Sequence, residues 1–219
     1  MDVIYEDNHI IIVNKRAGEI VQGDKTGDKP LVEIVKEYLK EKYNKPGNVF
    51  CGVVHRIDRP VAGLVIFAKT SKALSRLNEM FRKGEIHKSY RALVEGKMNP
   101  AKGKLKDYLV SNQKLNKTFV TSSMDSKAKL SELEYSTVSS GDRYTLLDIN
   151  LLTGRKHQIR AQLAANGNPI KGDLKYGAKR SNQDKGISLQ SAHLNFIHPV
   201  SKKIMKFTAP PLKEFEKFL

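Results

Sequence analysis

The sequence predicts an α+β fold built on a mixed, mostly antiparallel central β-sheet with flanking helices. Short apolar runs typical of strands outnumber segments with helical spacing. The two kinds do not alternate regularly, as they would around a parallel sheet. With 219 residues, the chain can bury a core without a disulfide or a structural metal. We therefore expect one domain, spanning residues 1–219.

Strands and helices follow one another in the N-terminal part of the chain. The apolar run at 9–15 predicts a strand, and the apolar spacing that follows Pro30 predicts a helix. The run at 63–70 reads as a buried strand. Ser71 is a suitable cap for a second helix, which Gly84 would end.

The C-terminal part is richer in strands, with one further helix. The helix is expected from about Gly154 to Asn166, ended by Gly167. A hairpin is expected around residues 140–142, because turn residues there separate two apolar runs. The expected strands are 89–96, 131–139, 143–152, 187–197 and 203–208.

The charge of the chain points to a polyanion partner. Lys and Arg number 39 against 23 Asp and Glu, which gives a net charge of +16. Between Lys97 and Lys129 the basic residues far outnumber the acidic ones. Such an excess favours nucleic acid as the partner, and the plainer alternative is a solvated basic surface. No apolar run is long enough to cross a membrane and the N-terminus is not a secretory signal, so we expect a cytoplasmic protein.

Several familiar kinds of site are not indicated. The six histidines and Cys51 lack the spacing of metal ligands. The stretch GDLKYGAK, at 172–179, departs from a phosphate loop because Ala178 stands where lysine is needed. No glycine-rich dinucleotide fingerprint follows a strand. We expect no metal and no cofactor. Cys51 itself is better explained as a small buried core residue than as a nucleophile, and a lone cysteine fits a reducing compartment.

One carboxylate stands out in the stretch HRIDRPVAGLVIFAKT, residues 55–70. Asp58 lies between Arg56 and Arg59, just before the predicted buried strand, and adjacent cations favour its ionised form. A fixed, ionised carboxylate can act as a nucleophile or stabilise a developing positive charge. The alternative is an ordinary turn aspartate paired with a surface arginine, and composition alone favours that alternative.

This stretch resembles the signature of the RluA-type pseudouridine synthases, approximately HRLDxxTSGLLLFAKT. Other stretches are similar to the family in the same order, so the resemblance spans nearly the whole chain. They are YEDNHIIIVNKRAG (5–18), HKSYRALVEG (87–96), LLTGRKHQIRAQLAANGNPIKGDLKYGA (151–178) and HLNFIHPVSKKIMKFTAPP (193–211). Arg16 replaces a usual proline, which would loosen that turn, and Pro60, Val61 and Ala62 stand around the usual Thr-Ser.

The resemblance implies a fold with a basic catalytic cleft and an isomerisation of uridine to pseudouridine within RNA. This reaction needs no redox cofactor, metal or energy source. By resemblance, Asp58 is the catalytic carboxylate, and the sequence leaves three roles open for it: addition to the base, addition to the sugar, or assistance of elimination. Tyr90 matches the active-site tyrosine, which can stack on uracil or accept the C5 proton. Arg160 matches the arginine that pairs with the aspartate. Its planar guanidinium suits a bidentate contact with a carboxylate.

Five further residues are expected to bind the RNA, of which Arg56 is assigned by resemblance. The target base must leave its stack before Asp58 can reach it, and Arg56 would fill the vacated space. Arg59 flanks the aspartate on its other side. A further group at the expected start of the third helix could grip phosphates, although a solvated helix start explains it equally well. That group is Arg155, Lys156 and His157.

The sequence thus predicts a stand-alone RNA pseudouridine synthase acting on structured ribosomal or transfer RNA. We expect a monomer without an obligate protein partner, a membrane association or the S4-like domain of some relatives. Three rivals remain at this point. They are a non-catalytic RNA chaperone on the same fold, a glycosidase that stops after bond cleavage, and a basic DNA-binding module. The combination of Asp58, Tyr90 and Arg160 argues against the first.

Overall fold

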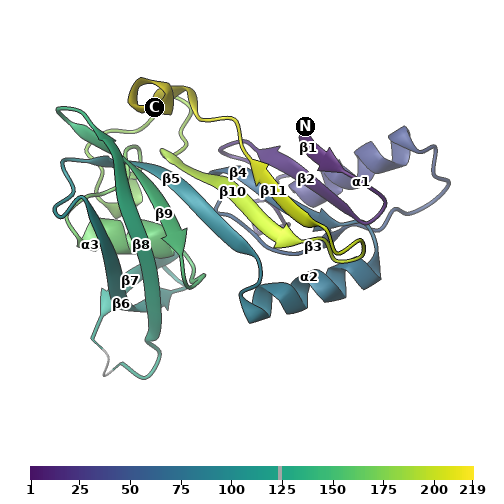
Figure 1. Ribbon diagram of the computed structural model, residues 1–219, viewed down its shortest axis with the longest axis horizontal. Helices are drawn as coiled ribbons and strands as arrows, with labels where there is room; N and C mark the ends of the chain where they lie inside the picture. The colour runs from purple at the N-terminus through teal and green to yellow at the C-terminus, as the bar shows by residue number, and fades with distance from the viewer. Residues whose placement is uncertain (123–124) are drawn as a thin grey trace. The chain divides into compact units, whose positions relative to one another are not determined.

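The computed structural model describes residues 1–122 and 125–219, and the chain divides into two compact units. The first unit holds residues 1–88 and 191–210, and the second holds residues 89–190 and 211–219. Figure 1 traces the chain through both units. Within the described residues, none of the helices has the length and apolar character that crossing a bilayer requires.

The first unit is organised around a sheet with the strand order β1-β2-β4-β10. The short β3 pairs with β4, and β11 pairs with β10 in an antiparallel hairpin. The strands are β1 (Asp2–Glu6), β2 (Ile10–Lys15), β3 (Gly52–Val53), β4 (Ala62–Ala68), β10 (Leu189–Ile197) and β11 (Ile204–Thr208). All residues of β4 are buried, so both faces of the sheet are covered at its centre.

Two helices belong to this unit, α1 (Leu31–Lys42) and α2 (Ser71–Lys83). Helix α2 places Ala73 and Leu77 on an apolar cluster with side chains from β2, β4 and β10. Its N-cap is Thr70, whose side chain accepts a hydrogen bond from the Ala73 N–H at 3.2 Å. At its other end Gly84 adopts φ 73°, the left-handed conformation that ends helices.

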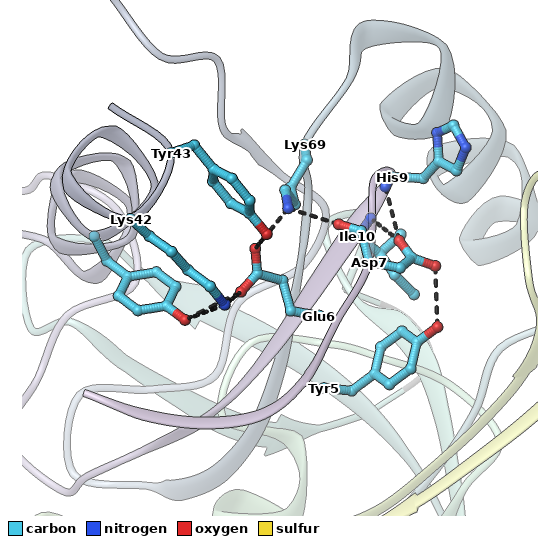
Figure 2. Close-up of polar contacts among 9 residues, drawn as sticks. Tyr5, Glu6, Asp7, His9, Ile10, Lys42, Tyr43 and Lys69 are labelled. Atoms are coloured by element: carbon cyan, nitrogen blue, oxygen red, sulfur yellow. Dashed lines mark hydrogen bonds and ion pairs between the residues drawn. The ribbon is translucent and has the colours of Figure 1, made fainter. Parts of the chain in front are cut away.

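A buried carboxylate ties α1 to the sheet (Figure 2). Glu6, at the end of β1, has a side chain that is only 7% exposed and accepts bonds from Lys42, Lys69 and Tyr43 at 2.6 to 2.8 Å. Burial alone would raise the pKa of Glu6, but these hydrogen bonds and the charge of Lys69 outweigh it and lower the pKa to about 2. One ionised group therefore joins β1, the end of β4 and the end of α1.

The second unit contains an antiparallel sheet with the strand order β5-β9-β8-β6-β7. The boundary between the units falls inside β5 and β10, so both strands contribute residues to each unit. The strands of this sheet are β5 (His87–Glu95), β6 (Lys102–Asn112), β7 (Lys117–Thr121), β8 (Lys129–Ser140) and β9 (Tyr144–Leu151).

A helix and two short helical turns complete the second unit. Helix α3 (Gln158–Ala165) packs against β6 and β7 through Ala161, which contacts Leu109 and Tyr176. The turn η1 (Leu174–Tyr176) follows it, and η2 (Lys213–Phe218) buries Phe215 against β5 and β9.

The predicted α+β fold with a mostly antiparallel sheet is confirmed, with corrections to individual elements. Helix α3 begins at Gln158 rather than near Gly154, because residues 154–157 form a turn. The cap of α2 is Thr70, with Ser71 as the first helical residue. The strands β1, β6 and β7 were not expected as separate elements; in β6 most of the residues are polar, and Lys side chains face solvent.

Candidate active site

The loop of residues 54–61, between β3 and β4, carries Asp58 in the first unit. Asp58 is half-buried, and its carbonyl accepts a hydrogen bond from the Val61 N–H at 3.0 Å, which closes a turn over Arg59 and Pro60. The next residue after this turn begins β4, which is buried throughout. The position of the carboxylate is therefore set by a tight turn attached directly to the core.

A buried lysine holds the same turn from the other side. Lys15, the last residue of β2, is 1% exposed, and its ammonium donates to the carbonyls of Arg16 and Arg59 at 2.9 and 3.1 Å. Burial lowers the pKa of Lys15 to about 8, although the negative charges of Glu19 and Asp58 oppose this effect. Lys15 thus places a positive charge near Asp58 and fixes the backbone of the residue that follows it.

The turn at Arg16 is closed in spite of the missing proline. The Arg16 N–H donates to the Glu19 carboxylate at 2.8 Å, and Gly18 adopts φ 91°. A proline at this position has no N–H and could not make the bond. The Gly18 N–H in turn donates to the carbonyl of Arg59 at 2.8 Å. Arg16 therefore gives this turn a hydrogen bond that the usual proline could not make.

His55 anchors the start of the Asp58 loop to β4. The backbone N–H of Ile66 donates to its Nε2 at 3.2 Å, so the neutral ring carries its proton on Nδ1. Burial lowers the pKa of His55 to about 3, with a smaller effect from the charge of Lys88. The imidazole stays neutral at physiological pH and acts here as a fixed hydrogen-bond acceptor.

Gly63 allows β4 to approach β10 directly after the loop. It adopts φ 113°, and a Cβ atom there would lie 2.3 Å from the carbonyl oxygen of Ser191. Backbone of a neighbouring strand cannot give way by that amount, so only glycine fits. The loop of Asp58 is thereby joined to the middle of the sheet rather than to a flexible edge.

The two arginines beside Asp58 differ in their surroundings. Arg56 is exposed, whereas Arg59 donates from Nε to the Gly18 carbonyl at 3.0 Å and forms an ion pair with Asp28. Arg59 therefore helps to fasten the loop of residues 18–28 to the turn. Arg56 presents its guanidinium to solvent, in the state that insertion into RNA would require.

Tyr90 and Arg160 both lie in the second unit and both are buried, with exposed fractions of 7% and 5%. Tyr90 lies on β5 opposite Ile149 of β9. Arg160, on α3, contacts Asp173 through two bonds, from Nε at 2.6 Å and from Nη2 at 2.9 Å. Its guanidinium lies over the ring of Tyr176, 4.8 Å from the centroid. Asp173 is 1% exposed, so this is a buried bidentate pair.

The residues before α3 form a turn with two different kinds of side chain. Arg155 and Lys156 are exposed, whereas His157 is buried, with φ 53° and its Nδ1 at 2.9 Å from the Tyr176 hydroxyl. The expectation of a helix start is wrong for all three. His157 supports Tyr176, the ring on which Arg160 lies, and the two exposed cations remain candidates for contact with phosphates.

Comparison with known proteins identifies the family. Residues 9–165 match the RNA pseudouridylate synthase family. The chain belongs to this family. It is 30% identical over 95% of its length to ribosomal large subunit pseudouridine synthase D of Zymomonas mobilis, and it covers 68% of that protein. Over 99% of its length it is 33% identical to ribosomal large subunit pseudouridine synthase C of Buchnera aphidicola, of which it covers 69%.

Solved structures confirm the pseudouridine synthase fold. Human RNA pseudouridylate synthase domain containing 4 matches 98% of this chain, and 90% of that structure is covered, with a TM-score of 0.81 at 19% identity. Human RNA pseudouridylate synthase domain containing 1 matches 95% of the chain, and 82% of that structure is covered, with a TM-score of 0.74 at 20% identity. The protein is thus an RNA pseudouridine synthase, an isomerase that acts on uridines in RNA.

Residues that the sequence did not single out support the candidate site of this pseudouridine synthase. Lys15 could have been noticed because it ends an apolar strand. Burying a lysine charge there is costly unless the ammonium has partners. Asp173 lies in the GDLKYGAK stretch and gave no signal of its own, because its partner is thirteen residues away on another element. His55 and Gly63 stand inside the recognised motif but received no role.

Two other features of the pseudouridine synthase concern a cysteine nucleophile and a metal site. Cys51 is buried, and burial raises its pKa to about 12, so the interpretation of this residue as part of the core is confirmed. Across residues 1–122 and 125–219, His, Cys, Asp and Glu side chains form no group of three or more that could hold a metal ion.

Proposed function

We propose that this protein converts specific uridines of ribosomal RNA to pseudouridine with Asp58 as the catalytic carboxylate. The observation that carries the proposal is the construction of the Asp58 turn. Lys15 and Gly18 bind the carbonyl of Arg59, His55 anchors the loop start, and β4 follows the turn at once. These bonds fix the backbone on both sides of one half-buried carboxylate, and a side chain held on a rigid backbone is typical of a preorganised active site.

The reaction moves one bond and one proton. The bond between N1 of uracil and C1′ of ribose breaks, the base turns, and C5 bonds to C1′. The proton on C5 must then leave, and N1 gains a proton. We assign Asp58 to this exchange, as the group that adds to the sugar or to the base, or that assists elimination. Tyr90 is assigned to stack on the uracil and to accept the C5 proton.

Arg160 is assigned to hold the Asp58 carboxylate ionised and correctly aimed. The Asp173 pair uses Nε and Nη2 and fixes the plane of the guanidinium. A rigid guanidinium loses little entropy when it binds a second carboxylate, and its charge favours the ionised form of that group. We propose a single pseudouridine synthase catalytic domain spanning residues 1–219.

Arg56 is assigned to occupy the space that the flipped uridine leaves in the RNA. Its exposure suits this role, since the side chain must reach into the RNA stack. Arg155 and Lys156 are assigned to phosphate contacts on the same grounds. For Arg59 and His157 we propose mainly support of the site, because both are engaged in contacts within the protein.

Large-subunit ribosomal RNA is the proposed substrate because relatives named for it align with nearly the whole chain. Transfer RNA is the alternative. We propose that the enzyme acts in the cytoplasm as a monomer without a protein partner.

Carbodiimide modification with primer extension, on RNA from cells with and without the protein, tests the substrate. The proposal expects stops in ribosomal RNA that vanish without the protein. Stops that disappear only from transfer RNA would favour the alternative, and identical maps would contradict the proposed activity.

A further inference from the structure

A basic pocket in the second unit lies outside the residues assigned to the chemistry. It has a volume of about 390 Å³, within the size range of small-molecule sites. Three segments line it, namely the end of β6, the segment that leads into β8 and the turn before α3. The lining residues are Leu109, Val110, Ser111, Lys127, Lys129, Gly154, Arg155 and Lys156.

The charge of this pocket is entirely positive. Four of its lining residues are cationic, and none of those described is acidic. Lys127, Lys129 and Lys156 are exposed, and none of them forms an ion pair in the part of the chain that the structure describes. The nearby Glu132 is instead paired with Lys104 and Lys106 on β6, so it does not neutralise the pocket. A cluster of cations with no acidic residue in the pocket lining attracts an anion with several oxygens.

The wall of the pocket is held in place by a buried glutamine. Gln158 is 3% exposed, and its side-chain oxygen accepts bonds from the Arg155 N–H at 3.0 Å and from the Thr153 hydroxyl at 2.8 Å. Its amide donates to the carbonyl of Glu132 at 3.1 Å. The turn with Arg155 and Lys156 is thereby fastened to β8. The backbone that carries these cations is fixed before any ligand arrives, which lowers the entropy cost of binding.

The opposite wall of the pocket, formed by the end of β6, is partly apolar. Strand β8 begins at Lys129, opposite Leu109, whereas β6 continues to Asn112. Residues 110–112 of β6 therefore have no pairing partner in β8. Val110 gives this wall an apolar surface, and the hydroxyl of Ser111 is hydrogen-bonded to the Thr118 hydroxyl at 2.9 Å. A sugar can lie on the apolar surface while the adjoining phosphate meets the lysines, a combination that a nucleotide unit of RNA provides.

We propose that this pocket binds the phosphodiester backbone of the RNA substrate, with Lys127 and Lys129 as binding residues beside Arg155 and Lys156. The inference deepens the proposed function, on which it rests for the identity of the polyanion. It adds two residues from a segment distant in sequence from the recognised motifs. It also assigns to Arg155 and Lys156 the same ligand as to the two lysines.

The test is the salt dependence of binding to a fluorescein-labelled oligo-uridylate, measured by anisotropy over a series of KCl concentrations. Removing one lysine that neutralises a phosphate of a single strand should reduce the slope of log Kd against log salt by about 0.7. Lys127→Ala with Lys129→Ala should therefore lower the slope by about 1.4 and weaken binding at low salt. Lys127→Arg with Lys129→Arg should keep the slope, because arginine also neutralises phosphate.

A matched control removes the same charge elsewhere. Lys40 on α1 and Lys72 on α2 are also exposed and make no ion pair within the described residues, so Lys40→Ala with Lys72→Ala has the same net charge as the test variant. The proposal expects the control to keep the slope of the wild type. Equal slopes for the alanine test variant and the control would overturn it. Because only binding is measured, this result is separate from any loss of isomerisation in Asp58 variants.

Discussion

At the scale of single residues, the candidate site depends on side chains that hold other side chains. Asp58 owes its position to Lys15 and His55, and Arg160 owes its plane to Asp173 and Tyr176. The groups assigned to touch the RNA are few, and the groups that orient them are buried. Substitutions of the orienting residues should therefore affect both activity and stability.

Arg160→Lys separates the role of the guanidinium from that of its charge. An ammonium keeps the charge opposite the buried Asp173 but cannot make two parallel bonds. We expect the single-turnover rate at saturating enzyme to fall on the order of a hundredfold, while RNA affinity changes only a few fold. A normal rate in a folded Arg160→Lys enzyme would contradict the assignment.

Arg160→Ala is the less informative variant, because it leaves Asp173 as an unpaired buried charge. Breaking such a pair costs about 3–5 kcal/mol of folding free energy. The thermal midpoint of each variant should accordingly be measured beside its rate. Asp173→Asn provides the matched comparison: it keeps the shape of the side chain and removes the charge that holds the guanidinium.

At the scale of elements, sequence patterns predicted the strands whose two faces are buried and the helices with distinct caps. Apolar runs marked β2, β4 and β10, and Pro30 and Gly84 marked helix ends. Strand β6 was not predicted because Lys102, Lys104 and Lys106 alternate with positions that include Gly103 and Asp107 as well as leucines. Strand β7 was not predicted because it is short and its apolar Phe119 and Val120 are adjacent and exposed. Helix α3 was predicted too long because residues 154–157 form a turn instead of helix. The side chain of Gln158 accepts a bond from the Arg155 N–H and donates to the carbonyl of Glu132. The contact with Glu132 joins residues distant in sequence, so residue spacing does not reveal it.

The same limit applies to the candidate site. The resemblance of the motifs supplied Asp58, Tyr90 and Arg160, and the structure supplied the residues that orient them. Asp173 became visible only when folding brought it to Arg160. Arg59 and His157 were predicted to contact RNA. In the structure Arg59 pairs with Asp28 and His157 contacts Tyr176, and neither contact was predicted from the sequence.

Glu6→Gln tests the buried junction between β1, β4 and α1. The ionised Glu6 accepts bonds from two lysines, so the variant should lower the free energy of unfolding by about 1–3 kcal/mol near neutral pH. Its pKa is about 2 in the fold and near 4.5 ordinarily. The stabilisation is thus complete above pH 4.5 and is lost as the pH falls toward 2.

Urea unfolding of Glu6→Gln and wild type over this pH range measures the difference. The two curves should converge as the pH approaches 2. A gap that stays constant with pH would show that the charge of Glu6 contributes nothing, and that shape alone explains the effect of the substitution.

At the scale of the whole molecule, the net charge of +16 and the family together account for the partner. The fold persists in human proteins with only about one residue in five identical, so the architecture tolerates wide substitution. What the whole chain adds is a strong electrostatic attraction to RNA, which brings the substrate to a small number of orienting contacts.

RNA binding by the wild-type enzyme should weaken steeply with salt, because much of the affinity arises when Lys and Arg displace counterions from phosphates. Filter binding of ribosomal RNA at increasing KCl measures the slope. An affinity that is flat between low and physiological salt would argue that the basic excess serves solubility only.

Tritium release from RNA that carries 5-tritiated uridine tests the assignment of Asp58 as the catalytic carboxylate, because the C5 proton leaves only when isomerisation proceeds. Asp58→Asn keeps nearly the same size and removes the charge and the nucleophile. We expect release by the wild type, no release by Asp58→Asn, and RNA affinity within a few fold for the two proteins. Substantial tritium release by a folded Asp58→Asn enzyme would contradict the account.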